Sequence, residues 1–231
     1  MKTIGLIGGM SWESTSTYYS TINQGVKQAL GGLHSAKIAM VSVDFAEIEV
    51  LQRQGKWRET GELLATAAQQ VESAGADFIV LCTNTMHKVV GQIEAAISIP
   101  VLHIADATAS KLKAEGISKV GLLGTKFTME QEFYKGRLQQ VHDIDVIVPT
   151  EDDQLVVHNV IYQELVLGVV NSESRQRYIE IITKLSEQGV QGVILGCTEI
   201  ALLVGQSDTS VLLFDTTGIH SQAAVEIALA D

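Results

Sequence analysis

The stretch A-G-A-D-F-I-V-L-C-T at residues 74–83 decides the fold, because Q-G-V-Q-G-V-I-L-G-C-T at residues 188–198 echoes it. Each stretch has a glycine, an apolar run and a cysteine followed by a threonine. Earlier in each half, I-G-L-I-G-G-M-S at 4–11 is echoed by V-G-L-L-G-T-K-F at 120–127. Two matches in the same order, at both ends of a half, indicate that the chain is a duplicated unit.

Short apolar runs alternate with longer helical patterns along the whole chain. The apolar runs are nearly continuous, which is typical of parallel strands that are buried on both faces. This alternation predicts an α/β fold with two pseudo-symmetric domains, each a parallel sheet covered by helices. The expected strands are residues 3–7, 37–43, 78–82, 101–104, 119–123, 145–148, 192–196 and 211–214. The expected helices include residues 61–74, 85–96, 107–114, 129–140, 154–167 and 174–188.

The duplication also predicts how the halves are arranged. We expect the first half to contain residues 1–98 with 208–231, and the second half to contain residues 99–207. In open parallel sheets, ligands bind beyond the carboxyl ends of the strands. Because both cysteines lie at such ends, we expect the active site in a cleft between the two halves.

The charge balance limits the classes of partner. The 231-residue chain has 16 basic and 27 acidic residues, and its formal net charge is −11. Such a surface repels nucleic acid and anionic membranes, so neither is expected as a partner. No apolar run has the length of a membrane span, and the N-terminal apolar segment runs straight into a glycine turn. We therefore expect a cytoplasmic protein that holds an anionic substrate in a local site.

The sequence gives little indication of a metal site or of a site for a common cofactor. The two cysteines, Cys82 and Cys197, are far apart and have no clustered histidine, so neither a zinc site nor a disulfide is expected. The glycine turn at residues 8–9 lacks the G-x-G-x-x-G spacing, and no acidic residue stands at the ribose position. We therefore expect no metal and no dinucleotide.

The two cysteines are candidate catalytic groups. A single free cysteine is usually a small buried hydrophobic residue, but two at corresponding strand ends are better explained as a site. Each is followed by a threonine and then by Asn84 or Glu199. Amides at the start of the next helix are expected to lower the pKa of the thiol from about 8.5 toward neutrality.

Polar residues around the same strand ends are candidate substrate contacts. Hydroxyl and amide donors suit a carboxylate, whereas a glutamate can accept a proton or bind an ammonium group. Gln52 or Arg53, which follow another strand end, can supply the second anchor that a dicarboxylate needs. His87, His103 and His220 are minor candidates. The predicted substrate-binding residues are Met10, Ser11, Gln52, Asn84, Thr85, Thr198 and Glu199.

Three ordered motifs, G-G-M-S, N-T-x-H and G-C-T-E, resemble those of the cofactor-independent aspartate/glutamate racemase superfamily. The resemblance covers essentially the whole chain and is closest to the enterobacterial type that is specific for L-aspartate and L-glutamate. It implies catalysis without pyridoxal phosphate or another cofactor, a small acidic amino acid as substrate, and a homodimer. It also implies one cysteine on each side of the substrate α-carbon.

The chain departs from this family at the first motif. The family has a cysteine directly before the asparagine, whereas here Thr83 precedes Asn84 and Cys82 lies one residue earlier. The family register favours Thr83 as the site residue, and the internal echo favours Cys82. Because successive strand residues point to opposite faces, both cannot face the cleft. We predict that Thr83 faces the cleft and that Cys82 packs behind it.

These residues predict racemisation of L-aspartate and/or L-glutamate. A thiol can act as a base near neutral pH, whereas a threonine hydroxyl stays protonated. Cys197 is therefore expected to remove the α-proton, and Thr83 or a water that it holds is expected to protonate the other face. The resemblance implies an arginine and a lysine in aspartate-specific members, at positions that correspond to Phe45 and approximately Val166. Gln52 would then be a neutral anchor with looser discrimination.

Two other functions remain open at this point. A single competent cysteine also suits a decarboxylase or a cis–trans isomerase of a small dicarboxylate, which release of CO2 or formation of fumarate would reveal. A non-catalytic binder of acidic amino acids would leave the optical rotation unchanged and would not need Cys197.

Overall fold

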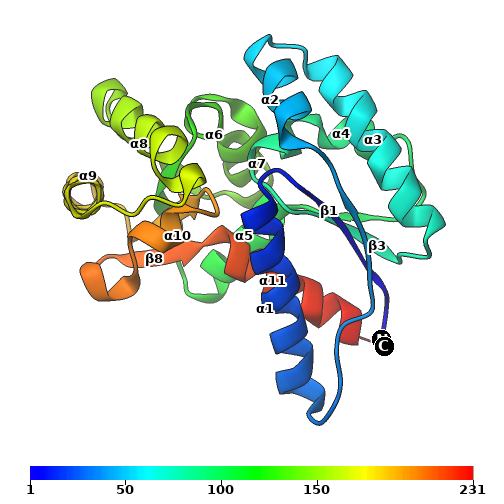
Figure 1. Cartoon of the computed structure of the whole chain (residues 1–231). Coiled ribbons are helices and arrows are strands. Elements are labelled where there is room, and N and C mark those ends of the chain that lie inside the picture. Colours follow the sequence, from blue (N-terminus) through cyan, green and yellow to red (C-terminus); the bar gives the residue numbers. More distant parts are fainter. Residues whose placement is uncertain (231) are drawn as a thin grey trace. The chain divides into compact units, whose positions relative to one another are not determined.

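The computed structural model describes residues 1–230 and divides into two compact units (Figure 1). The first unit contains residues 1–104 and 220–231, and the second contains residues 105–219. Each unit is built on a four-stranded parallel sheet, and the strand orders β2-β1-β3-β4 and β6-β5-β7-β8 are the same arrangement repeated. The predicted α/β fold with two pseudo-symmetric domains is confirmed.

The strands lie where the apolar runs predict them. In the first unit they are β1 (Ile4–Gly8), β2 (Ile38–Ser42), β3 (Phe78–Leu81) and β4 (Val101–Leu102). In the second unit they are β5 (Lys119–Gly124), β6 (Asp145–Ile147), β7 (Gly192–Gly196) and β8 (Leu212–Asp215).

The helices of the first unit are α1 (Trp12–Leu30), α2 (Phe45–Arg53), α3 (Trp57–Ser73), the 3₁₀ helix η1 (Thr85–Val89) and α4 (Val90–Glu94). The helix α5 (Ile104–Ala114) begins at the last residue of the first segment of unit 1, and the rest of it belongs to the second unit. The helices of the second unit are α6 (Lys126–Glu130), α7 (Glu132–His142), α8 (Glu151–Gln163), η2 (Leu165–Leu167), α9 (Ser172–Glu187), α10 (Ile200–Leu203) and η3 (Gln206–Asp208). The last helix is α11 (Thr216–Leu229).

The boundaries between the units differ from the predicted ones, 1–98 with 208–231 and 99–207. The division falls after residue 104 and again after residue 219, inside α11. Strand pairing explains the difference. Val101 of β4 pairs with Ile79, which keeps β4 in the first sheet, and Leu213 of β8 pairs with Val193, which keeps β8 in the second.

In the first unit, alternating strand residues pack on two different helical layers. Leu6 and Val80 pack with α1 and α11, whereas Ile7 and Leu81 pack with α2 and α3. This is the two-sided burial expected of a parallel sheet. In the second unit, Leu195 belongs to a core built with α8, α9 and α10. Each sheet is thus packed into the core of its own unit.

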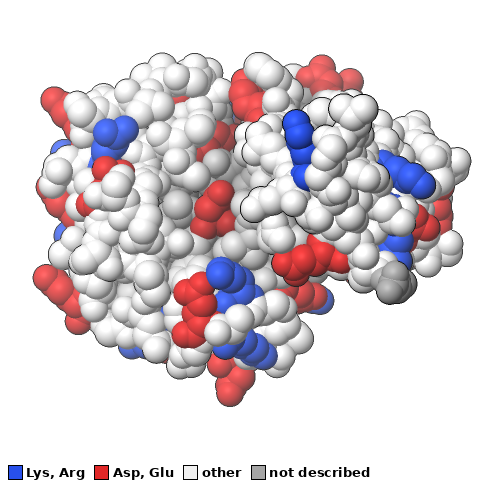
Figure 2. All heavy atoms as spheres, turned by 90° about the horizontal axis from the view of Figure 1, so that it is seen from below, with Lys and Arg blue, Asp and Glu red and all other residues white. Residues whose placement is uncertain are grey.

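The surface keeps the charged residues dispersed. On the face in Figure 2, Lys and Arg side chains lie among Asp and Glu side chains. No helix within the described part of the chain has the length and apolarity needed to cross a bilayer.

Candidate active site

The turn after β1 holds Met10 and Ser11 at the carboxyl end of the first sheet. Gly9 has φ +92°, and a Cβ there would collide with the carbonyl oxygen of Val43, so glycine is required. The Gly9 N–H donates to Thr15 Oγ1 at 2.8 Å. Ser11 caps α1, and Met10 is buried in the core beneath the turn. These contacts hold the turn against the end of the first sheet.

At the end of β3, Cys82 is a core residue. Its side chain is fully buried in the cluster that α1 and α11 form with the sheet, and its Sγ lies 3.8 Å from the Val80 carbonyl oxygen. Burial raises the pKa of the Cys82 thiol. The Cys82 carbonyl accepts a hydrogen bond from the Ser14 hydroxyl at 3.3 Å, which ties the start of α1 to this strand end. A thiol in this environment stays protonated and inert.

The strand pairings show which residues correspond in the two units. Before β3, the Asp77 N–H donates to the Thr3 carbonyl at 2.8 Å. Before β7, the Gln191 N–H donates to the Lys119 carbonyl at 2.8 Å. Because β1 and β5 hold the same place in their sheets, Asp77 and Gln191 are equivalent positions.

This equivalence corrects the alignment that the internal echo suggests. Thr83 lies as many residues beyond Asp77 as Cys197 lies beyond Gln191. Cys82 then corresponds to the glycine that ends β7. The sequence echo, which aligned Cys82 with Cys197, is therefore out by one residue.

Thr83, Asn84 and Thr85 are all at least nine-tenths buried. The Thr83 N–H donates to the Leu81 carbonyl at 2.8 Å, so the chain turns as soon as β3 ends. The helix expected over residues 85–96 is a 3₁₀ turn followed by the short α4. The three residues thus sit together in a tight polar turn beside the end of β1.

Gln52 is one of the two buried residues of α2, and it is only 4% exposed. Neither its amide nitrogen nor its amide oxygen has a hydrogen-bond partner within residues 1–230. Leaving such a group unsatisfied costs about 1–3 kcal/mol. Its neighbour Arg53 is exposed and pairs with Glu49 at 3.8 Å. Of the two anchors that the sequence suggested, Gln52 is the one whose polar atoms are buried and unpaired.

In the second unit, Cys197, Thr198 and Glu199 form one hydrogen-bonded group. The Cys197 thiol donates to Glu199 Oε2 at 3.0 Å, and the Thr198 hydroxyl donates to the same oxygen at 2.6 Å. Glu199 is 6% exposed, so its carboxylate lies in a poorly solvated environment. The carboxylate is therefore placed to accept the thiol proton.

The prediction of a lowered thiol pKa is wrong in direction. Burial raises the pKa of Cys197 well above its ordinary value, and the negative charge of Glu199 raises it further. The backbone amides of Thr198 and Glu199 act in the opposite direction but contribute less. The following helix, α10, is only one turn long.

Three buried histidines gather in the first unit, one within η1, one just before α5 and one within α11. The ring centroids of His87 and His103 lie 4.5 Å apart, and those of His87 and His220 lie 6.0 Å apart. Burial lowers the pKa of His220 to about 4. Sequence reasoning treated these residues as separate minor candidates because they are far apart in the chain, and so it missed the cluster.

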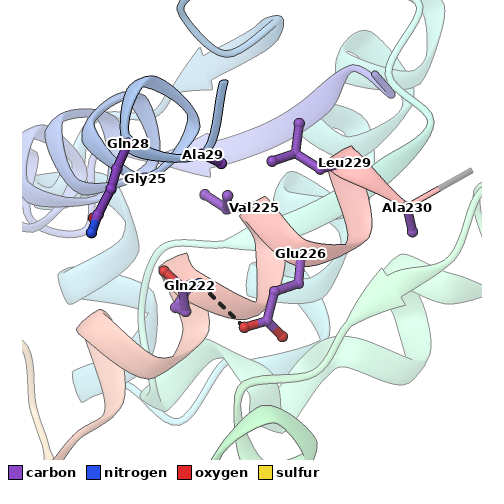
Figure 3. Close-up of a pocket in the computed structure, with 8 residues that line it drawn as sticks. All are labelled: Gly25, Gln28, Ala29, Gln222, Val225, Glu226, Leu229 and Ala230. Carbon is purple, nitrogen blue, oxygen red and sulfur yellow. Dashed lines mark hydrogen bonds between the residues drawn. The ribbon is translucent and has the colours of Figure 1, made fainter. Parts of the chain in front are cut away.

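Other features do not add to the site. Among residues 1–230, no three His, Cys, Asp or Glu side chains are arranged to hold a metal ion. A groove of 540 Å³ lies between the C-terminal parts of α1 and α11, lined by Gln28 of α1 and by Gln222 and Glu226 of α11, which hydrogen-bond to each other (Figure 3). The Lys2 N–H, just before β1, donates to the Ala228 carbonyl at this end of α11. The groove therefore lies by the amino ends of the strands, away from the candidate residues.

A model of the Asp/Glu/Hydantoin racemase family matches residues 7–224. The chain belongs to this family. A Yersinia pestis protein, described as a candidate Asp/Glu racemase, is 58% identical with a TM-score of 0.95, and an aspartate racemase homologue from Pyrococcus horikoshii OT3 is 32% identical with a TM-score of 0.87. Both alignments cover 100% of each chain. The broad-specificity amino-acid racemase of Bacillus subtilis strain 168 is 21% identical, over 98% of each chain.

The chain is therefore a member of a racemase family that includes amino-acid racemases. Racemisation requires a proton to leave one face of the α-carbon and another to arrive at the opposite face. The groups at the two equivalent strand ends, one hydroxyl and one thiol, are the residues to consider for these steps.

The thiol–carboxylate pair predicts the effect of Glu199→Gln. Removing the negative charge should lower the pKa of the Cys197 thiol, since that charge raises it. The rate of iodoacetamide alkylation against pH measures this, in a Cys82→Ala background so that only Cys197 reports. Glu187→Gln, on an exposed part of α9, is the matched control and should leave the profile unchanged. An unchanged or raised pKa in Glu199→Gln would contradict the assigned cause.

Proposed function

We propose that this racemase converts L-aspartate and/or L-glutamate into the D-enantiomer, and back, without a cofactor. Cys197 removes the α-proton of the L-substrate, and Thr83, or a water that it holds, protonates the opposite face. The observation that supports this most directly is the equivalence of Thr83 and Cys197 in the repeated strand register. The two residues occupy the same position relative to the sheet of their own unit.

In the proposed reaction, Glu199 prepares the base. The Cys197 thiol gives its proton to Glu199 Oε2, which already accepts hydrogen bonds from Cys197 and Thr198. The resulting thiolate takes the α-proton and leaves a carbanion. A thiolate whose conjugate acid has a raised pKa is a stronger base, so the buried pair favours abstraction once the thiol has ionised.

Thr83 is less suited to its proton transfer than Cys197 is to the removal of the α-proton. The Thr83 hydroxyl gives its proton to the carbanion and is left as an alkoxide, which takes a proton from water, while Glu199 releases the proton that it accepted, before the next turnover. Acting in reverse, the neutral hydroxyl is a poor base for the D-enantiomer. We therefore expect L-substrates to be processed with a much higher kcat than D-substrates.

Thermodynamics limits that asymmetry. Mirror-image substrates have the same free energy, so kcat/KM must be equal in the two directions. A lower kcat for the D-enantiomer must be matched by a lower KM in the same proportion. Apparent one-way turnover therefore reflects these separate constants or slow recycling of the protonation state.

The substrate is proposed to lie against the polar turns described above. Ser11, Asn84, Thr85 and Thr198 are proposed to supply the donors for the α-carboxylate, whereas the side chain of Met10, which the sequence suggested as a substrate contact, lies in the core. Gln52 is proposed to donate to the side-chain carboxylate, which would satisfy its buried amide. A neutral anchor discriminates less strongly than a charged one between the side-chain lengths of aspartate and glutamate. A homodimer and a cytoplasmic location stay predictions from the sequence.

Replacing each cysteine tests the assignment of roles. Cys197→Ser should abolish exchange of the α-proton of L-aspartate and L-glutamate with deuterated solvent, because a serine hydroxyl does not ionise near neutral pH. Cys82→Ala should retain most activity, because its thiol is buried in the core. Proton NMR of the α-position measures both. Loss of activity in Cys82→Ala with the fold intact, or release of CO2 instead of exchange, would refute the proposal.

Gln52→Leu tests the substrate anchor. Leucine has a similar size and no polar atom, so it should raise KM for both L-substrates while leaving the protein equally stable or more stable. Steady-state kinetics and urea unfolding measure the two effects. Arg53→Leu, one residue along the same helix and exposed, is the control and should change neither. An unchanged KM in Gln52→Leu would remove this residue from the site.

A further inference from the structure

We infer that His87 is a positioning residue of this racemase: its imidazole fastens the backbone of Thr83 to the first residue of α5. This inference rests on the proposed function, because it assigns a purpose to holding Thr83 in place. The ring of His87 contacts the backbone of the turn and not the reacting atoms.

The two ring nitrogens of His87 have fixed and different roles. Nδ1 lies 2.8 Å from the Thr83 carbonyl oxygen, and because a carbonyl only accepts, Nδ1 must carry the hydrogen. Nε2 lies 3.2 Å from the Ile104 backbone nitrogen, whose N–H donates, so Nε2 must be bare. The ring therefore has one neutral tautomer and joins two backbone segments that are distant in sequence.

A second histidine, His220, holds the backbone at Leu102, two residues before Ile104. His220 Nε2 lies 2.9 Å from the Leu102 carbonyl oxygen and must donate to it, while Nδ1 lies 2.9 Å from the Tyr18 hydroxyl and accepts from it. The tautomer of His220 is thus opposite to that of His87. Between them the two rings fix the chain on both sides of His103, so the anchor of the His87 ring is itself held in place.

The Thr83 turn depends on this anchor because it has little secondary structure of its own. β3 ends at Leu81, and the residues after Asn84 form only a 3₁₀ turn, whose hydrogen bonds have poorer geometry than those of an α-helix. The hydrogen bond from His87 holds the carbonyl of Thr83 itself, the residue whose side chain is proposed to deliver the proton. Displacing a reacting group by about 1 Å can cost roughly 100-fold in rate.

The buried surroundings of His87 keep both of its hydrogen bonds intact near neutral pH. His87 is 1% exposed, and burial together with the neighbouring His103 and His220 lowers its pKa well below the usual value. A protonated ring could not accept from the Ile104 N–H. The neutral ring thus maintains both bonds around neutrality, which suits a fixed support.

Two substitutions separate the two bonds. His87→Asn places an amide N–H near Nδ1 and keeps the bond to Thr83, whereas His87→Gln reaches toward Nε2 and keeps only the contact with Ile104. In deuterated water with L-glutamate, two rates are followed: deuterium entry at the α-carbon of the L-form, which reports Cys197, and formation of the D-enantiomer, which reports Thr83. His87→Gln should lower the second rate relative to the first by roughly 10- to 100-fold. His87→Asn should keep the wild-type ratio.

Controls separate positioning from stability and from failure of the proposed function. His220→Gln keeps a donor for the Leu102 carbonyl and loses only the bond to Tyr18, so it should lower the urea midpoint without changing the ratio of the two rates. If His87→Gln also leaves the ratio unchanged, or if both His87 variants change it equally, the inference is overturned. Deuterium entry that survives Cys197→Ser would instead overturn the proposed function.

A measurement on the unaltered protein covers the case in which the variants do not fold. Nitrogen-15 NMR of histidine-labelled wild type should show His87 with a hydrogen on Nδ1 and none on Nε2 between pH 6 and 8. The opposite tautomer would exclude the bond to Thr83 and overturn the inference.

Discussion

The register of the strands at the carboxyl ends of β3 and β7 is the constraint on which the site depends. In a parallel sheet, the hydrogen-bond ladder fixes where each strand ends relative to its neighbour, and a shift of one residue turns a side chain to the other face. Here the ladders place Thr83 and Cys197 at equivalent positions and send Cys82 into the core. A conspicuous cysteine is thereby a packing residue, and a threonine takes the place that a thiol holds in the other unit.

The chemistry at those positions is set by what lies next to them. Burial and the Glu199 carboxylate keep the Cys197 thiol protonated in the free protein, and the same carboxylate is the acceptor nearest to its proton. In the first unit the support is uncharged: hydroxyl caps, backbone bonds and neutral histidines hold the turns. The two units share a fold but contribute different groups, which gives the proposed reaction a strong base on one side only.

The sequence was sufficient for the fold, but not for the interactions among the candidate site residues. Continuous apolar runs predicted every strand, because two-sided burial leaves a clear pattern. The predicted boundaries between the units differ from those of the structure because the sequence of β4 or β8 does not show which strand it pairs with. The pKa of Cys197 was predicted in the wrong direction because the thiol is buried and because Glu199 turns its carboxylate back onto it. Neither the burial nor the side-chain direction is encoded in the spacing of the residues. The histidine cluster unites residues that only folding brings together.

The central claim is that Thr83 is the group that acts opposite Cys197. Thr83→Cys tests it directly, because restoring a thiol at that position should supply the missing base. In proton NMR in deuterated water, the account predicts that the variant exchanges the α-proton of D-aspartate or D-glutamate with a clearly higher kcat than the wild type, with exchange of the L-enantiomers retained. If turnover of both D-enantiomers stays at the wild-type level in a folded variant, Thr83 does not face the substrate and the account is contradicted.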